Sequence, residues 1–302
     1  NASDFFEGKN NNKSKLNKYF SDLNRSKIYF IRIACHQTEI YKIKPIIKWF
    51  NKKGVLVTVN LMQISELNDT EMNINLICKF LDKNGVKVLY LADSLGSLSP
   101  KNIKKIYFKF KKYWNGELGL HAHDNLNQAL NNSLTAISYG ATWIDSTLMG
   151  MGRGPGNLSS EKIVNNLFKS KYKNLQIKKF NKKFMEPLKK KYKWGTNLYY
   201  KFSAKNKIHP TYVQKLLLDK RYDKNNYLKI LENLKKVDAK KFNPFKLIAS
   251  SNIYTDNIKS AWQPINDLKD KEVLVIGSGS SVKRNLKKIK ELILSKNLLV
   301  FV

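Results

Sequence analysis

The sequence predicts an α/β fold built around a parallel β-sheet. Five apolar segments of strand length, centred near Ile28, Val55, Val86, Leu118 and Trp143, alternate with segments in which apolar residues recur at helical spacing. Such alternation is typical of parallel sheets joined by right-handed crossovers. The spacing by itself does not distinguish an open, doubly wound sheet from a barrel. Two further features, a His-x-His triplet and a glycine-rich loop, indicate where a functional site lies.

These strands and helices follow a polar start, residues 1–24, which is rich in Lys and Asn and predicts a surface loop and a short helix. We expect strands at residues 27–33, 55–61, 86–92, 117–120 and 142–148. We expect the intervening helices at residues 40–53, 69–83, 100–110 and 126–137. Each helix has an apolar stripe, and Gly54 and Gly140 stand where a left-handed residue commonly ends a helix.

The second half of the chain predicts two further regions. Residues 171–263 have helical, lysine-rich periodicity, and residues 264–302 contain a strand, a Gly-Ser-Gly-Ser turn, a helix and a second strand. That last pattern is typical of the start of a Rossmann-like unit, and residues 263–267 read as the linker before it. The turn could bind phosphate, but it lacks the third glycine and the acidic residue of the dinucleotide fingerprint. We therefore divide the chain into domains 1–170, 171–263 and 264–302.

The charge balance is strongly basic, with a formal net charge of +33. A basic excess of this size suggests a polyanionic partner. However, only five of the 56 basic residues are arginines, and the lysines are spread over nearly every predicted helix. Arginine supplies most bidentate contacts to phosphates and bases. The pattern therefore favours a general lysine bias, and we do not expect nucleic acid as a partner.

The chain has two cysteines, Cys35 and Cys78, which are too few for a disulfide framework. No segment resembles a signal peptide, and no apolar run approaches the ~18 residues that cross a bilayer. We expect a cytoplasmic protein with no membrane partner. The sequence leaves the oligomeric state open, a homo-oligomer included.

The triplet His121-Ala122-His123 follows a short apolar strand and is the first candidate site. Side chains alternate along a strand, so the two imidazoles point to the same face. Two imidazoles on one face can share a divalent metal ion. A lone triplet of this kind is more commonly a solvated strand end. Because the chain has only four histidines and two of them are here, we favour the metal site.

An ordered run of residues resembles the DRE-TIM metallolyases, the HMGL-like enzymes. It comprises His-Ala-His-Asp-Asn at 121–125, a helix, and Asp-Ser-Thr-x-x-Gly-Met-Gly-x-Gly-x-Gly-Asn at 145–157. The pattern is most similar to pyruvate aldolases of the 4-hydroxy-2-oxovalerate aldolase type. The resemblance implies a partial TIM barrel containing strands four to eight, followed by a helical domain. It also implies that strands one to three lie upstream of Asn1, so that the chain as given is an incomplete catalytic unit.

The resemblance further implies a divalent cation, Mn²⁺ or Mg²⁺, held by His121, His123 and Asn157. In the family a further ligand is an Asp of an Arg-Asp-Gly motif, which would lie upstream of Asn1. Asn157 has an equally plausible structural interpretation as the N-cap of the helix beginning near Ser159 and Ser160.

Three residues are assigned catalytic roles on the same basis: Arg32, His36 and Tyr200. Arg32 lies in a strand, where it either meets the substrate carboxylate or pairs with Glu39 or Asp93. His36 follows the same strand at the end where barrels carry function. The family uses a tyrosine of the helical domain as an acid, and Tyr199, Tyr200 and Tyr212 are all candidates.

Four residues are expected to contact or orient ligands: Asp93, Ser94, Gly152 and Gly154. Asp145, in the last barrel strand, is expected to hold the imidazole of a metal ligand in one tautomer.

We therefore expect a carbon–carbon lyase that cleaves or condenses a small 2-oxo acid through a pyruvate enolate. A Claisen-type acyl-CoA synthase or lyase on the same barrel is the enzymatic alternative. A non-catalytic polyanion-binding protein is the alternative from another class.

Overall fold

The computed structural model describes residues 1–6, 12–23, 26–168, 175–251, 272–277, 282, 284–296 and 298–301. The chain divides into two compact units, Asn1–Asn252 and Ile253–Val302. The first unit contains both the predicted barrel region and the predicted helical region.

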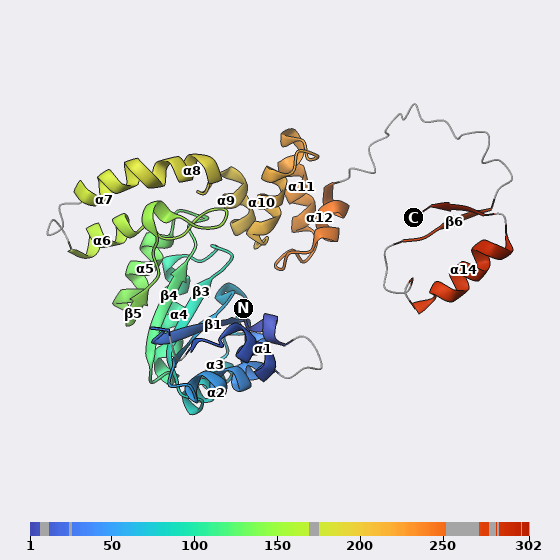
Figure 1. Ribbon diagram of the computed structural model, residues 1–302. Coiled ribbons are helices and arrows are strands. Elements are labelled where there is room, and N and C mark those ends of the chain that lie inside the picture. The colour runs from blue at the N-terminus through green and yellow to red at the C-terminus, as the bar shows by residue number, and fades with distance from the viewer. Residues whose placement is uncertain are drawn as a thin grey trace. The chain divides into compact units, whose positions relative to one another are not determined.

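A five-stranded parallel sheet forms the centre of the first unit, which confirms the predicted α/β fold with a parallel sheet (Figure 1). Its strands, in spatial as well as chain order, are β1 (Phe30–Cys35), β2 (Leu56–Leu61), β3 (Val86–Asp93), β4 (Glu117–Ala122) and β5 (Ala141–Ile144). Parallel neighbours require a crossover, and a helix follows each of the first four strands. The carboxyl ends of all five strands consequently meet at one edge of the sheet.

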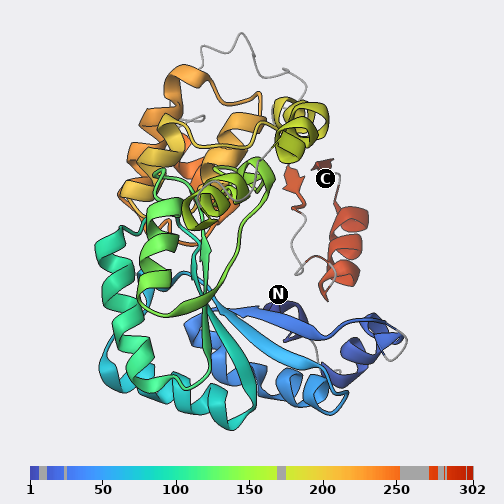
Figure 2. The ribbon, with the colours of Figure 1, turned by 90° about the vertical axis from the view of Figure 1, so that its left-hand side faces the viewer.

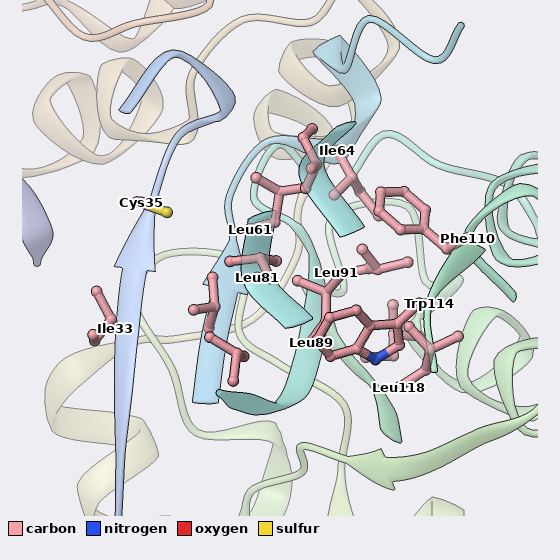
Figure 3. Close-up of a cluster of buried hydrophobic side chains, with 14 of the residues drawn as sticks. Ile33, Cys35, Leu61, Ile64, Leu81, Leu89, Leu91, Phe110, Trp114 and Leu118 are labelled. Atoms are coloured by element: carbon pink, nitrogen blue, oxygen red, sulfur yellow. The ribbon is translucent and has the colours of Figure 1, made fainter. Parts of the chain in front are cut away.

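Helices cover one face of this sheet and form the main hydrophobic core with it. They are α2 (Lys44–Asn51), α3 (Glu71–Lys83), α4 (Pro100–Tyr113) and α5 (Ala129–Ser138). Figure 3 shows how Phe110, and Trp114 just after α4, pack near Leu89, Leu91 and Leu118 of the sheet. Burying one such side chain contributes about 1.5–3 kcal/mol relative to exposure. The core therefore fixes which face of each strand is turned away from the helices.

The face of the sheet away from these helices is polar and aromatic. The guanidinium carbon of Arg32 lies 4.1 Å from the centre of the Tyr90 ring. The rings of Phe30 in β1 and Trp143 in β5 have centroids 6.0 Å apart, although these two strands are not neighbours in the sheet. Side-chain contact between the first and last strands shows that the sheet is strongly curved.

Two elements are shorter than predicted, for local reasons. The helix expected from residue 126 begins at Ala129, because Asp124 Oδ1 accepts a hydrogen bond from Ala129 N and Asn127 has a positive φ of 57°. The strand expected at 142–148 ends at Ile144. The chain then turns into the 3-10 helix η5 (Leu148–Gly150).

Smaller elements complete the first half of this unit. They are η1 (Ala2–Phe5), α1 (Asn12–Tyr19), η3 (Gln37–Ile43) and η4 (Ile64–Glu66). The predicted short N-terminal helix is present as α1. The single helix expected at 40–53 is instead η3 followed by α2, with Pro45 in the first turn of α2.

The rest of the first unit is helical, as predicted. Its elements are α6 (Ser160–Phe168), α7 (Leu175–Phe180), the π-helix η6 (Asn181–Met185), α8 (Glu186–Tyr192), α9 (Leu198–Lys205), α10 (Pro210–Leu218), η7 (Lys224–Asn226), α11 (Tyr227–Lys235) and α12 (Pro244–Ser251). Helices α9 to α12 have a second hydrophobic core (Figure 2). This helical segment is joined to the sheet's carboxyl edge by ion pairs from Lys207 and Lys240 to Glu66.

The second unit has the predicted strand–helix–strand pattern. β6 (Val273–Val275) and β7 (Leu299–Phe301) pair in parallel, and α14 (Leu286–Ser295) lies between them in sequence. The predicted linker at 263–267 and Ser278 to Ser280 of the predicted turn lie outside the described residues. In the described part of the chain, no helix has the length and apolar character needed to cross a membrane.

Candidate active site

All four histidines of the chain, His36, His121, His123 and His209, line one cavity of about 540 Å³ at the carboxyl edge of the sheet. His36 follows β1, and the pair at 121 and 123 ends β4. His209 begins α10 on the opposite, helical side. The cavity therefore lies where strand ends and the helical segment face each other. In parallel α/β proteins this edge commonly carries the functional site.

The two imidazoles of the triplet point their Nε2 atoms at each other, 3.3 Å apart. Their Nδ1 atoms are held from behind, His121 by Asp145 Oδ2 at 2.8 Å and His123 by the carbonyl oxygen of Ser94 at 3.1 Å. A carbonyl oxygen can only accept a hydrogen bond, so Nδ1 of His123 carries the proton. The two Nε2 atoms then face each other on the side of the rings away from these acceptors.

This geometry fits a shared metal ion. Two nitrogens that each lie about 2.1 Å from one cation, at right angles, are about 3 Å apart. The 3.3 Å between the Nε2 atoms is close to that separation. Among the described residues, no group of three or more His, Cys, Asp or Glu side chains could hold a metal. The two Nε2 atoms are therefore the candidate metal ligands at this site, and their role as ligands stays a prediction.

The electrostatics of the pair suit metal binding. Burial, assisted by His121, lowers the pKa of His123 to about 4, so its imidazole is neutral at physiological pH. Burial alone would raise the pKa of Asp145, but hydrogen bonds from His121 and Arg32 outweigh it and lower that pKa. Asp145 thus remains ionised beside His121 Nδ1, and its predicted role of holding a metal ligand in one tautomer stays a prediction.

Arg32 donates from Nη1 to Asp145 Oδ2 at 2.6 Å. Both alternative ion pairs considered from the sequence are wrong. Glu39 accepts a hydrogen bond from the backbone nitrogen of His36, and Asp93 accepts from Ser97 N and Leu98 N. Arg32 is not among the residues that line the cavity, so its predicted contact with a substrate carboxylate stays a prediction.

Asp93 is the last residue of β3 and Ser94 follows it, but the two side chains have different surroundings. Asp93 is fully buried, and burial raises its pKa to about 6 despite three backbone N–H donors. Its carboxylate therefore holds the loop between β3 and α4. Ser94 lines the cavity, and its carbonyl oxygen orients His123. The prediction that these residues contact substrate itself is untested.

The glycine-rich loop is tightly packed. A Cβ at Gly152 would lie 2.8 Å from Asn157 Nδ2, and Gly154, with a φ of +63°, would place a Cβ 3.0 Å from Tyr200 Oη. Both positions therefore favour glycine because a side chain would collide or strain the backbone. The predicted contact of these glycines with substrate remains a prediction.

Asn157 does not cap the helix that follows it. Ser159 Oγ accepts the hydrogen bond from Lys162 N, so the N-cap interpretation of Asn157 is wrong. The Asn157 amide instead donates to the carbonyl oxygen of Met151. Its side chain borders a separate hollow of about 910 Å³ beside the loop rather than the histidine cavity. Its predicted role as a metal ligand is untested.

The three candidate tyrosines differ clearly in position. Tyr199 packs edge-on against Tyr227, and the Tyr212 hydroxyl bonds to Lys241 O and Asn243 N. Tyr200 alone of the three lies against the glycine-rich loop, beside Gly154. Burial raises the pKa of Tyr200 to about 12, so its hydroxyl keeps its proton and can act as a donor or acid.

Three basic side chains that line the cavity were missed by sequence reasoning: Arg153, His209 and Lys241. His209 appears in the sequence as the residue before Pro210 at a helix start, and its Nδ1 accepts a hydrogen bond from Thr211 N at 3.3 Å. The scarcity of histidine was the signal that could have identified it. Nothing in the sequence distinguishes Lys241 from the other lysines.

Relatives of known sequence indicate the family of this chain. Residues 21–183 match the model of the HMGL-like family. A 4-hydroxy-2-oxovalerate aldolase of Rhodococcus opacus is 34% identical over 134 residues, which is 44% of this chain and 38% of that protein. An oxaloacetate decarboxylase of Mycobacterium tuberculosis is 31% identical over 143 residues, 47% of this chain and 42% of that protein. The chain thus spans about two fifths of the length of these relatives.

Solved structures give the same assignment. The N-terminal domain of a proposed aldolase from Bacteroides vulgatus is 30% identical, with a TM-score of 0.60, over 69% of this chain and 71% of that chain. The carboxyl transferase domain of Rhizobium etli pyruvate carboxylase has a TM-score of 0.62 over 78% of this chain and 43% of that chain. At 13% identity, it shows the fold alone. The family match covers more than half of the sequence and includes both histidines of the converging pair, and the chain belongs to the HMGL-like family.

Proposed function

We propose that this protein is a divalent-metal-dependent lyase that cleaves or forms a carbon–carbon bond next to a 2-oxo acid, through a pyruvate enolate. The observation that carries the proposal is the approach of the two imidazole Nε2 atoms to 3.3 Å, with each ring fixed from behind by a hydrogen bond at Nδ1. The similarity to 4-hydroxy-2-oxovalerate aldolases supports the same reaction class.

The residues in and around the cavity have separate tasks in this proposal. His121 and His123 hold Mn²⁺ or Mg²⁺, which when bound stabilises the negative charge on the enolate oxygen. Asp145 fixes His121, and Arg32 in turn keeps Asp145 ionised. His36 at one side of the cavity and Tyr200 behind the glycine-rich loop are the candidates for proton transfer to and from substrate.

We also propose that the five strands are the fourth to eighth strands of a TIM barrel. Side-chain contact between β1 and β5, through Phe30–Trp143 and Arg32–Asp145, supports a strongly curved rather than an open sheet. The position of the cavity at the strands' carboxyl ends fits the same architecture.

Two other reactions are compatible with the same centre. Decarboxylation of a 2-oxo dicarboxylate also passes through an enolate, and one relative is an oxaloacetate decarboxylase. A Claisen-type reaction on an acyl-CoA is the second. A polyanion-binding role rests only on the net charge of +33, and retention on duplex DNA at physiological salt would support it.

The test is release of pyruvate from 4-hydroxy-2-oxovalerate by the full-length protein, coupled to lactate dehydrogenase. We expect turnover that requires Mn²⁺ or Mg²⁺, stops on chelation with EDTA and returns when metal is restored. A turnover rate that is unchanged by EDTA would contradict the proposal. Activity with acetyl-CoA but with no 2-oxo acid cleavage would favour the Claisen-type alternative.

A further inference from the structure

In the part of the chain that the structure describes, the histidine cavity is lined by cationic but not by acidic side chains. Two cationic side chains, Arg153 and Lys241, are among the residues that line it, and no Asp or Glu is. Neither cation has an ion pair with a carboxylate in the part of the chain that the structure describes. The acidic residue nearest the metal-binding pair, Asp145, is already bonded to Arg32 and His121.

Other cationic side chains nearby have carboxylate partners, unlike the two that line the cavity. Lys240 pairs with Glu66 at 2.5 Å, whereas Lys241, the next residue, faces the cavity without a carboxylate. Arg32 is neutralised by Asp145 at 2.6 Å, whereas Arg153 reaches the cavity from the glycine-rich loop. Acidic partners were thus available on this edge of the sheet and are used by other cations.

The positive charge acts within the cavity. Burial is the main cause that lowers the pKa values of His209 and His36, and the positive charge of Arg153 adds to it at His209, as that of Lys241 does at His36. Arg153 comes from the glycine-rich loop, and Lys241 comes from the segment between α11 and α12. A cavity lined by one sign of charge raises the local concentration of ligands of opposite charge.

We propose that the substrate carries a second carboxylate, remote from its 2-oxo acid group, which Arg153 and Lys241 recognise. The inference rests on the proposed function, because the histidine-bound metal accounts for the 2-oxo acid end. A guanidinium and an ammonium suit a carboxylate as bidentate and point-charge donors. The substrate is therefore a 2-oxo dicarboxylate, and the uncharged tail of 4-hydroxy-2-oxovalerate leaves both cations without a partner.

Binding of two matched probes tests the inference without turnover. 2-Oxoglutarate and 2-oxovalerate have the same carbon chain and differ in a carboxylate or a methyl group at the far end. Titration calorimetry of the full-length protein with Mn²⁺ should show tighter binding of 2-oxoglutarate. The substitution Lys241→Met should weaken that binding about tenfold, the loss of one charge-assisted hydrogen bond, and leave 2-oxovalerate almost unchanged.

Lys240→Met is the matched control, because it removes the same charge one residue away from a lysine already paired with Glu66. It should leave the affinity for both probes unchanged. Arg153→Gln should repeat the effect of Lys241→Met, and Lys241→Arg should restore most of the affinity. Equal binding of the two probes, or equal weakening by the two lysine substitutions, would overturn the inference.

Two further arms separate the possible failures. If the protein cleaves 4-hydroxy-2-oxovalerate with metal but shows no preference for 4-hydroxy-2-oxoglutarate, the dicarboxylate inference fails and the proposed function stands. If neither probe binds in the presence of Mn²⁺, the proposed function itself fails. Binding of acetyl-CoA that weakens in Lys241→Met, without discrimination between the two 2-oxo acids, would assign the cations to a phosphate-bearing ligand instead.

Discussion

The two walls of the histidine cavity are built differently. On the wall formed by the strand ends, both imidazoles of the pair at residues 121 and 123 are held in place by protein acceptors. On the wall formed by the glycine-rich loop and the helical segment, Arg153 and Lys241 have no carboxylate partner among the described residues. The strand wall is therefore organised before any ligand binds, whereas the helical wall has cationic donors that can bind a ligand.

This difference follows from what each wall is made of. A buried strand fixes side-chain direction by backbone geometry, and a second hydrogen bond then fixes each ring. Long side chains on a loop or a helix end keep their rotamer freedom until a partner binds. We therefore expect substitutions on the strand wall to affect metal binding and chemistry, and those on the helical wall to affect substrate choice or stability.

The largest effect is expected from His123→Ala, and His121→Ala should act in the same way. Each removes one of two converging nitrogens, so metal-dependent pyruvate release should fall to background. Mn²⁺ titration followed by electron paramagnetic resonance should show weakened binding, while circular dichroism stays near that of the wild type. Normal turnover in either variant, with metal titrated, would falsify the assignment of the strand wall as the metal site.

A smaller loss is expected from Asp145→Asn. The amide no longer attracts the His121 proton as a carboxylate does and no longer neutralises Arg32, so metal affinity should fall about 10–100-fold. Asp69→Asn is the control, because Asp69 pairs with Lys105 and Lys109 away from the cavity. Equal Mn²⁺ dissociation constants for the two variants would mean that the hydrogen bond behind His121 is unimportant.

The helical wall should show a pH-dependent stability through His209. Burial lowers the pKa of His209 from 6.5 to about 4, so the unfolded chain binds a proton more readily than the folded one. His209 therefore has almost no effect on the free energy of unfolding above about pH 7, and it lowers that free energy as the pH falls towards 4. The free energy of unfolding should decrease by about 1 kcal/mol between about pH 7 and pH 5.5 through this residue.

Urea denaturation of wild type and His209→Gln at both pH values measures this effect. Loss of the hydrogen bond from Thr211 N to the ring changes the free energy of unfolding of the variant by the same amount at both pH values. Any change with pH in the difference between the unfolding free energies of the two proteins therefore comes from the titration of His209. The same difference at both pH values would show that His209 has the same pKa in the folded protein as in the unfolded chain.

The smallest effect is expected from a pair of glycine substitutions. Gly154→Ala and Gly54→Ala both place a Cβ on a left-handed residue, at φ of +63° and +73°, which costs about 1 kcal/mol. Only the first also meets another side chain, Tyr200, at 3.0 Å, whereas nothing lies within 4 Å at Gly54. The melting temperature should fall slightly more in Gly154→Ala, and the KM should rise in that variant alone. Identical kinetics would make the loop a simple connector.

Much of the fold could be predicted because its signals are local. The five strands, the helices between them and the strand–helix–strand pattern of the second unit follow from apolar periodicity over a few residues. Boundaries were less predictable. The helix after β4 begins at Ala129 because the Asp124 side chain binds the Ala129 backbone nitrogen, and such competition between side chain and backbone leaves no trace in periodicity.

The sequence by itself determined the order of strands and helices, the shared face of His121 and His123, and the family, since alternation along a strand and an ordered motif need no distant contact. Only the tertiary structure decided that Arg32 pairs with Asp145 and that Tyr200, rather than Tyr199 or Tyr212, borders the glycine-rich loop. It also decided that His209 and Lys241 face the histidine pair. Those contacts join residues far apart in the chain, and closing such distances depends on how the sheet curves and where the helical segment packs.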